Sequence, residues 1–196
     1  NEAGDRFAES LLAADLDNDG YDDLVIGTPG EDVGPEGSEF VDAGALYVVR
    51  GTAGGLDLGG AACWTENNLV SQTSVADGDG FGTAFAAGDA DDDGYLELAV
   101  GSPFKTASGQ VQAGLVILMP GSNFGPTDFG IARVWQQDSP AVPDASEPFD
   151  RFGRVLLCRL DRRGLLLDER DQVIDNIGVF QPVVGDAADI DLVGVV

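Results

Sequence analysis

The chain has 196 residues, of which 10 are basic and 35 acidic, so its formal net charge at pH 7 is −25. A surface this negative argues against binding to nucleic acid or to anionic membranes. The hydrophobic content of 43% is ordinary for a folded domain, and no apolar run approaches the roughly 20 residues that cross a bilayer. Residues 1–5 do not resemble a signal peptide, which indicates a mature form or a fragment.

Similar short motifs begin at residues 5, 79 and 150, where the sequence reads Asp-Arg-Phe-Ala, Asp-Gly-Phe-Gly and Asp-Arg-Phe-Gly. An acidic loop follows the first two motifs at the same distance, at residues 15–23 and 89–97. Self-similarity of this kind indicates tandem repeats. We expect repeat 1 at 1–74, repeat 2 at 75–145, and a degenerate or partial repeat 3 at 146–196.

Both acidic loops place carboxylates at positions 1, 3, 5 and 9 and glycine at position 6. Alternate side chains of a tight loop converge on one point, and Ca²⁺ takes six to eight oxygen ligands. The glycine permits the sharp turn after position 5, and position 7 would contribute its backbone carbonyl. We therefore expect two Ca²⁺ sites, with the ligands Asp15, Asp17, Asp19, Tyr21 and Asp23 in the first loop and Asp89, Asp91, Asp93, Tyr95 and Glu97 in the second.

The spacing does not fit an EF-hand, whose loop ends in a glutamate at position 12. That position holds Ile26 in the first loop and Val100 in the second. The flanking residues 11–14 and 24–26 are short apolar runs without a helical period, which favours a strand–loop–strand hairpin. A merely solvated turn would explain one such loop, but it explains two matching copies poorly.

Further strands are predicted after each loop. A Gly-x-Pro segment (27–29, 101–103) leads to an apolar strand (43–49, 113–119), and a glycine turn then precedes a short strand near Trp64 or Trp135. Four short strands per repeat, separated by Gly, Pro and Asp, indicate an all-β fold. We interpret the two tryptophans as core anchors.

The Phe-Gly motif, the loop pattern Asp-x-Asp-x-Asp-Gly-x-x-Asp and the following Gly-x-Pro together resemble FG-GAP repeats, the blades of the integrin alpha-subunit β-propeller. The resemblance covers nearly all of 1–145 and, more loosely, 146–196. It is closest to bacterial secreted tandem FG-GAP repeat proteins, which share the segments at 64–67 and 135–138. It implies tandem four-stranded β-propeller-type blades.

The third repeat departs from this pattern. Either alignment of its loop leaves one carboxylate at the four ligand positions, Asp168 or Asp161, so no metal site is expected there. Residues 151–170 hold six of the ten basic residues. Guanidinium groups could replace the missing cation, but we favour an altered terminal repeat. Residues 186–196 nevertheless resemble the third strand of repeat 1 and its lead-in, 41–49.

Two cysteines are present, Cys63 and Cys158, at unrelated positions in their repeats. We expect buried small residues rather than a disulfide framework, and a bridge between the two stays open.

Fewer than three repeats cannot close a propeller, which needs roughly four to eight blades. Exposed blade edges are expected to associate, either within a longer protein or with other copies of the chain. The predicted function is a calcium-stabilised structural or adhesive module, extracellular or at the cell surface, that binds a protein partner or copies of itself. A calcium-rich exterior suits such loops.

Two other classes of function fit the sequence less well. A carbohydrate-binding, lectin-like propeller fragment would need solvent-exposed Trp64 and Trp135. A hydrolase is disfavoured because the chain has no histidine, which removes the commonest general base, and because the tight acid pairs are better explained as metal ligands than as glycosidase carboxylates. We therefore expect neither catalytic residues nor enzyme activity.

Overall fold

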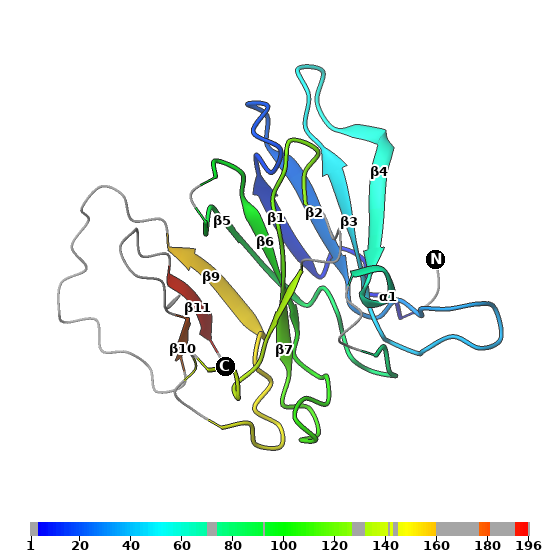
Figure 1. Ribbon diagram of the computed structural model, residues 1–196. Helices are drawn as coiled ribbons and strands as arrows, with labels where there is room; N and C mark the ends of the chain where they lie inside the picture. The colour runs from blue at the N-terminus through cyan, green and yellow to red at the C-terminus, as the bar shows by residue number, and fades with distance from the viewer. Residues whose placement is uncertain are drawn as a thin grey trace.

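A computed structural model describes residues 4–69, 74–91, 93–126, 132–140, 142, 145–159, 177–180 and 191–195. They form three antiparallel sheets, which follow one another along the chain and do not close into a ring (Figure 1). The fold is therefore all-β, as predicted, with blade-like sheets that remain an open array.

The first two sheets each contain four strands in chain order. Sheet 1 consists of β1 (Ser10–Ala14), β2 (Asp23–Thr28), β3 (Ala45–Arg50) and β4 (Asp57–Thr65), followed by the short helix α1 (Glu66–Leu69). Sheet 2 consists of β5 (Ala84–Gly88), β6 (Glu97–Ser102), β7 (Leu115–Met119) and β8 (Arg133–Trp135). The four strands expected in each of these repeats are thus present. The repeat boundaries stay predictions.

Sheet 3 has a different strand order. It contains β9 (Val155–Arg159), β10 (Ile177–Phe180) and β11 (Asp191–Val195). Strand β11 pairs directly with β9, where sheets 1 and 2 place their second strand. The tail is therefore a strand, as its resemblance to 41–49 suggested. Residues 160–176, which include the degenerate loop, lie outside the described residues.

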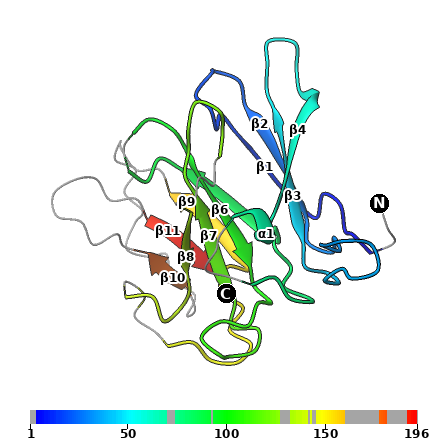
Figure 2. The ribbon, with the colours of Figure 1, turned by 45° about the vertical axis from the view of Figure 1, so that its right-hand side comes forward.

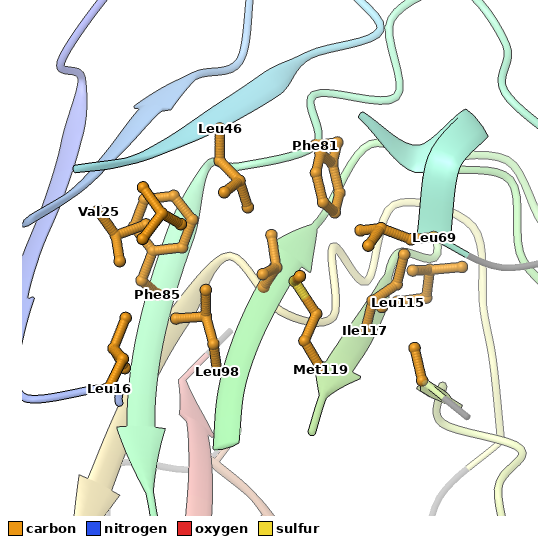
Figure 3. Close-up of a cluster of buried hydrophobic side chains, with 13 residues drawn as sticks. Leu16, Val25, Leu46, Leu69, Phe81, Phe85, Leu98, Leu115, Ile117 and Met119 are labelled. Carbon is orange, nitrogen blue, oxygen red and sulfur yellow. The ribbon is translucent and has the colours of Figure 1, made fainter. Parts of the chain in front are cut away.

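The main core lies between sheets 1 and 2. Leu16, Val25 and Leu46 face Phe85, Leu98 and Ile117, and Leu69 of α1 closes one end (Figure 3). A smaller cluster joins the other face of sheet 2 to Phe152 and Leu156. Figure 2 shows the three sheets turned relative to one another. Each sheet therefore buries apolar residues against its neighbour.

The Phe-Gly motif joins each repeat to the one before it. The N–H of Phe81 donates to the carbonyl of Ala43 at 2.9 Å, and that of Phe152 donates to Ala113 at 2.8 Å. Gly44 follows Ala43 with a φ of +93°, and a Cβ there would lie 2.3 Å from the Phe81 carbonyl oxygen. Only glycine permits both the backbone conformation and the close approach.

Trp64 and Trp135 are half-buried and pack against the two core clusters, as expected of core anchors. The expectation of a buried Cys63 was wrong. Cys63 is exposed and free, because it lies on β4, the outermost strand of sheet 1, opposite Tyr47. The side chain of Cys158 lies outside the described residues. No helix in the described part of the chain is long and apolar enough to cross a membrane.

Candidate metal centre

Each acidic loop lies at the turn of a two-stranded hairpin. The first loop connects β1 to β2, with Ala14 opposite Asp23, and the second connects β5 to β6, with Gly88 opposite Glu97. Neither loop is flanked by helices, so the strand–loop–strand prediction is confirmed and an EF-hand is excluded. The hairpins bring position 1 and position 9 of each loop to adjacent strand ends.

Position 1 organises each loop through backbone hydrogen bonds. Asp15 accepts from the N–H groups of Asp19 at 3.0 Å and Gly20 at 2.9 Å. Asp89 accepts from Gly94 at 3.2 Å. Gly20 and Gly94 both have a φ of +93°, which confirms the sharp turn expected at position 6.

Carboxylate oxygens of Asp15, Asp17 and Asp19 lie within 4.8 Å of one another, as do those of Asp89, Asp91 and Glu97. Asp23 and Asp93 are outside these two groups. The hydrogen bond at position 5 does not explain the difference between the loops. Asp93 accepts from the N–H of Tyr95 at 2.9 Å, and Asp19 accepts equally from Tyr21, yet Asp19 stays within its group.

The oxygen chemistry of both groups fits a hard divalent cation. Asp17 Oδ1 and Asp89 Oδ1 are buried and have no hydrogen-bond partner among the described residues. A buried carboxylate oxygen without a donor is costly, and a cation bound by several carboxylates removes that cost together with their mutual repulsion. The residues present therefore fit Ca²⁺ or a similar ion, which prefers oxygen ligands.

Position 9 has a structural role that the sequence alone did not reveal. Asp23 accepts from the N–H groups of Leu16 at 3.2 Å and Gly51 at 2.8 Å. Glu97 accepts from the equivalent Ala90 and Gly121. This carboxylate thus joins its own loop to the turn after the third strand of the sheet.

Burial raises the pKa of both Asp23 and Glu97, and the backbone N–H donors oppose that shift. The N–H groups of Gly51 and Leu16 act on Asp23, whereas those of Ala90 and Gly121 act on Glu97. The two position-9 residues differ in length, and the longer Glu97 also reaches the oxygens of Asp89 and Asp91. In the second loop, the carboxylate at position 9 can therefore both accept from the backbone N–H groups and contribute a ligand to a metal ion.

Two basic side chains have structural roles that were not predicted from the sequence, and one of them, Arg50, lies beside the first loop. Arg50 Nη1 lies 3.6 Å from Asp17 Oδ2, and its Nη2 donates to the carbonyl of Phe124 in the turn after β7. Lys105 is 95% buried and is the only lysine in the chain. A sequence signal did exist for Lys105, since a lone lysine in so acidic a chain, next to a Gly-x-Pro segment, indicates a paired cation.

Lys105 Nζ lies at the centre of a buried polar cluster between repeats 1 and 2. It contacts Glu66 Oε1 at 2.9 Å, Asp79 Oδ2 at 2.7 Å and the carbonyl oxygen of Ser74 at 2.7 Å. Glu66 and Asp79 are each 98% buried. The cluster therefore ties α1, at the end of sheet 1, to the beginning and middle of repeat 2.

Stacked four-stranded sheets with an acidic hairpin loop in each define a β-propeller-type repeat protein. Residues 7–49 and 81–119 match the FG-GAP repeat family. The chain belongs to that family, as the resemblance of its motifs predicted. The matched segments contain both acidic loops and the first three strands of sheets 1 and 2, except for Arg50 at the end of β3.

The chain is similar to several integrin alpha subunits. It is 33% identical over 168 residues to integrin alpha-PS2 of Drosophila melanogaster, an alignment that covers 82% of this chain and 11% of that protein. It is 32% identical over 120 residues to integrin alpha-5 of Xenopus laevis, covering 61% of the chain and 10% of that protein. The chain therefore spans only about a tenth of the length of these relatives.

A relative of another kind is phosphatidylinositol-glycan-specific phospholipase D of Dictyostelium discoideum. It is 24% identical over 159 residues, which cover 76% of this chain and 16% of that protein. Segments similar to this chain thus occur in proteins with different names, so the similarity alone does not define a function.

Proposed function

We propose that the chain is a calcium-stabilised, extracellular structural or adhesive module. The observation that carries this proposal is the pair of carboxylate groups, each with a buried oxygen that lacks a donor: Asp17 Oδ1 in the first loop and Asp89 Oδ1 in the second. Two Ca²⁺ ions per chain, one in each loop, would supply the missing partner. Each ion would fix a hairpin whose position-9 carboxylate already joins three segments of the sheet.

The extracellular location is supported by the integrin alpha relatives and by the chemistry of the loops. Acidic loops of modest affinity are filled where Ca²⁺ is abundant, as it is outside cells. A structural role also fits the surroundings of the acids, because each position-9 carboxylate is occupied by backbone N–H groups. We propose no catalytic role for these residues.

A protein partner is supported by the outer face of sheet 1, defined here as Phe7, Leu11, Ile26 and Tyr47. Leu11, Ile26 and Tyr47 are neighbours across β1, β2 and β3, and the ring of Phe7 lies 6.0 Å from that of Tyr47. The same row in sheet 2 is Phe81, Phe85, Val100 and Ile117, all of which are buried against sheet 1.

The outer face of sheet 1 therefore has the residues of a blade interface but no covering sheet among the described residues. Phe7 is 60% exposed and Leu11 is 59% exposed, whereas the equivalent Phe81 is fully buried. Exposed apolar rows of this kind mark contact surfaces. We propose that a further blade or another copy of the chain covers this face.

A glycan-binding role receives less support. Trp64 and Trp135 are half-buried in the two core clusters, so their rings are not free platforms for stacking against a sugar.

Removal of Ca²⁺ by a chelator should lower the melting temperature of the protein. A site that binds the folded state alone, filled at about 100 times its dissociation constant, stabilises by about 2.7 kcal/mol, so two such sites should shift the transition by several degrees. Circular dichroism melts with excess Ca²⁺ and with a chelator measure the shift. An unchanged melt, or an equal shift in the double variant Asp17→Ala/Asp91→Ala, would contradict structural calcium.

Substitution of the outer face of sheet 1 should abolish self-association. We expect the unaltered chain to gain mass with concentration in light scattering coupled to size exclusion, and the double variant Phe7→Ser/Leu11→Ser to remain a monomer. The matched control is Phe149→Ser/Val111→Ser, which changes two similarly exposed apolar residues elsewhere and should associate normally. A chain that stays monomeric at every concentration, with and without Ca²⁺, would rule out association between copies.

A further inference from the structure

The two acidic loops are equal in acid content but differ in one neighbouring charge. Each loop contains five acidic residues among its nine positions. In the first loop, Asp17 also forms an ion pair with Arg50 at 3.6 Å. In the described residues, no basic side chain forms an ion pair with the second loop.

The strand register gives the reason for this asymmetry. Gly51 and Gly121 are equivalent, because each donates its N–H to the position-9 carboxylate of its own sheet. The residue before each glycine is Arg50 in sheet 1 and Pro120 in sheet 2. A proline has no charge to offer, so the guanidinium is a feature of the first site alone.

Arg50 is held at Asp17 by a second contact. Its Nη2 donates to the carbonyl of Phe124, in a turn of sheet 2 that is itself fixed by Ser122 hydrogen bonds to Phe124 and Gly125. Asp17 is 93% buried, and its Oδ1, unlike Oδ2, has no partner. The guanidinium therefore pairs with Oδ2 of Asp17, and Oδ1 is the oxygen that can bind a cation.

We infer that Arg50 makes the first loop the weaker of the two Ca²⁺ sites, because its positive charge competes with the ion for Asp17. This inference rests on the proposed binding of Ca²⁺ by both loops. The second loop fills first as Ca²⁺ rises, and the first loop fills at higher concentration. Ca²⁺ bound in the first loop weakens the ion pair between Arg50 and Asp17. Because Arg50 also donates to the carbonyl of Phe124 in sheet 2, filling of this loop alters a contact between sheets 1 and 2.

The size of the effect follows from the distance and the exposure of the pair. Arg50 is 41% exposed and lies 3.6 Å from Asp17, so water screens its repulsion of an ion bound to that carboxylate, and we expect the ion to bind about tenfold more weakly. A guanidinium is not deprotonated in proteins, so it cannot relieve this repulsion by losing its charge.

Calorimetric titration of the metal-free protein with Ca²⁺ tests this inference. Asp91→Ala leaves the first loop and Asp17→Ala leaves the second, so we expect the former variant to bind about tenfold more weakly. Adding Arg50→Gln to Asp91→Ala should restore about tenfold tighter binding. Adding it to Asp17→Ala should change nothing, since Arg50 does not touch the second loop.

Two further variants separate charge from structure. Arg50→Lys keeps the positive charge without the planar fork, so the first loop should stay weak. Arg6→Gln, which removes an equally exposed charge paired with Glu9, should leave both affinities within about twofold, because exposed charges this remote are screened.

The possible failures are distinguishable. Equal affinities in Asp91→Ala and Asp17→Ala, or weaker binding after Arg50→Gln, would overturn the role of Arg50 while leaving the calcium sites intact. An absence of Ca²⁺ binding by the unaltered chain would overturn the proposed function and the inference together. Thermal melts of the metal-free variants, read at the same time, establish that each one is folded.

Discussion

Replacing Lys105 by methionine should lower the free energy of unfolding by about 3–5 kcal/mol, the usual cost of removing one partner from a buried ion pair. Methionine keeps the length of the side chain, so little packing is lost, but Glu66 and Asp79 are left as two buried carboxylates without their cation. The carbonyl of Ser74 also loses its donor. Urea denaturation, read as the change in midpoint at constant slope, measures this cost.

The matched control for Lys105 is Arg6→Met. Arg6 pairs with Glu9 on the surface, where both side chains are about 40% exposed, and such pairs contribute about 0–1 kcal/mol. Both substitutions remove one positive charge, so the difference between their losses in free energy of unfolding measures the effect of burial. A Lys105→Met variant as stable as Arg6→Met would show that the buried cluster does not hold repeats 1 and 2 together.

Replacing Phe81 by alanine should cost about 3–5 kcal/mol, the range for removal of a buried aromatic ring. Phe81 is fully buried between sheets 1 and 2, and its backbone N–H joins it to Ala43. The neighbouring segments cannot move into the cavity left by the missing ring, because the backbone of Phe81 is already in close contact with Gly44. Chemical denaturation at low protein concentration measures the loss.

Phe7→Ala is the control for Phe81, since Phe7 occupies the same place in the first repeat. It is 60% exposed and contacts the ring of Tyr47 at 6.0 Å between centroids, so we expect a loss of about 1 kcal/mol or less. Similar losses for the two variants in the monomer would mean that the Phe-Gly motif stabilises its own repeat rather than the junction with the previous one.

Much of the fold was readable from the sequence because the signals are local. Glycine at position 6, alternating acids and short apolar flanks specify a hairpin within about 20 residues, and two copies specify a repeat. The strands of sheets 1 and 2 follow this order, and the tryptophans reach the core as expected. Sheet 3 was less predictable, since the pairing of β11 with β9 joins segments more than 30 residues apart.

The site residues show the same contrast between what local spacing predicts and what depends on the folded structure. The convergence of Asp15, Asp17 and Asp19 follows from spacing alone. The second group contains Glu97 and not Asp93, although Asp93 stands at the same position as Asp19, and spacing does not reveal that. Cys63 is exposed because its strand is at the edge of sheet 1, a place that its small apolar neighbours did not indicate.

By itself the sequence determined the two acidic hairpins, the blade-like repeats and the loss of ligands in the third loop, because each depends on residues close together in the chain. Only the tertiary structure decided that Lys105 joins Glu66 to Asp79, that Arg50 reaches Asp17, and that Phe7 is left uncovered while Phe81 is buried. These relations link residues tens of positions apart. They exist only once hydrophobic burial has stacked sheet 1 on sheet 2, and no local pattern encodes them.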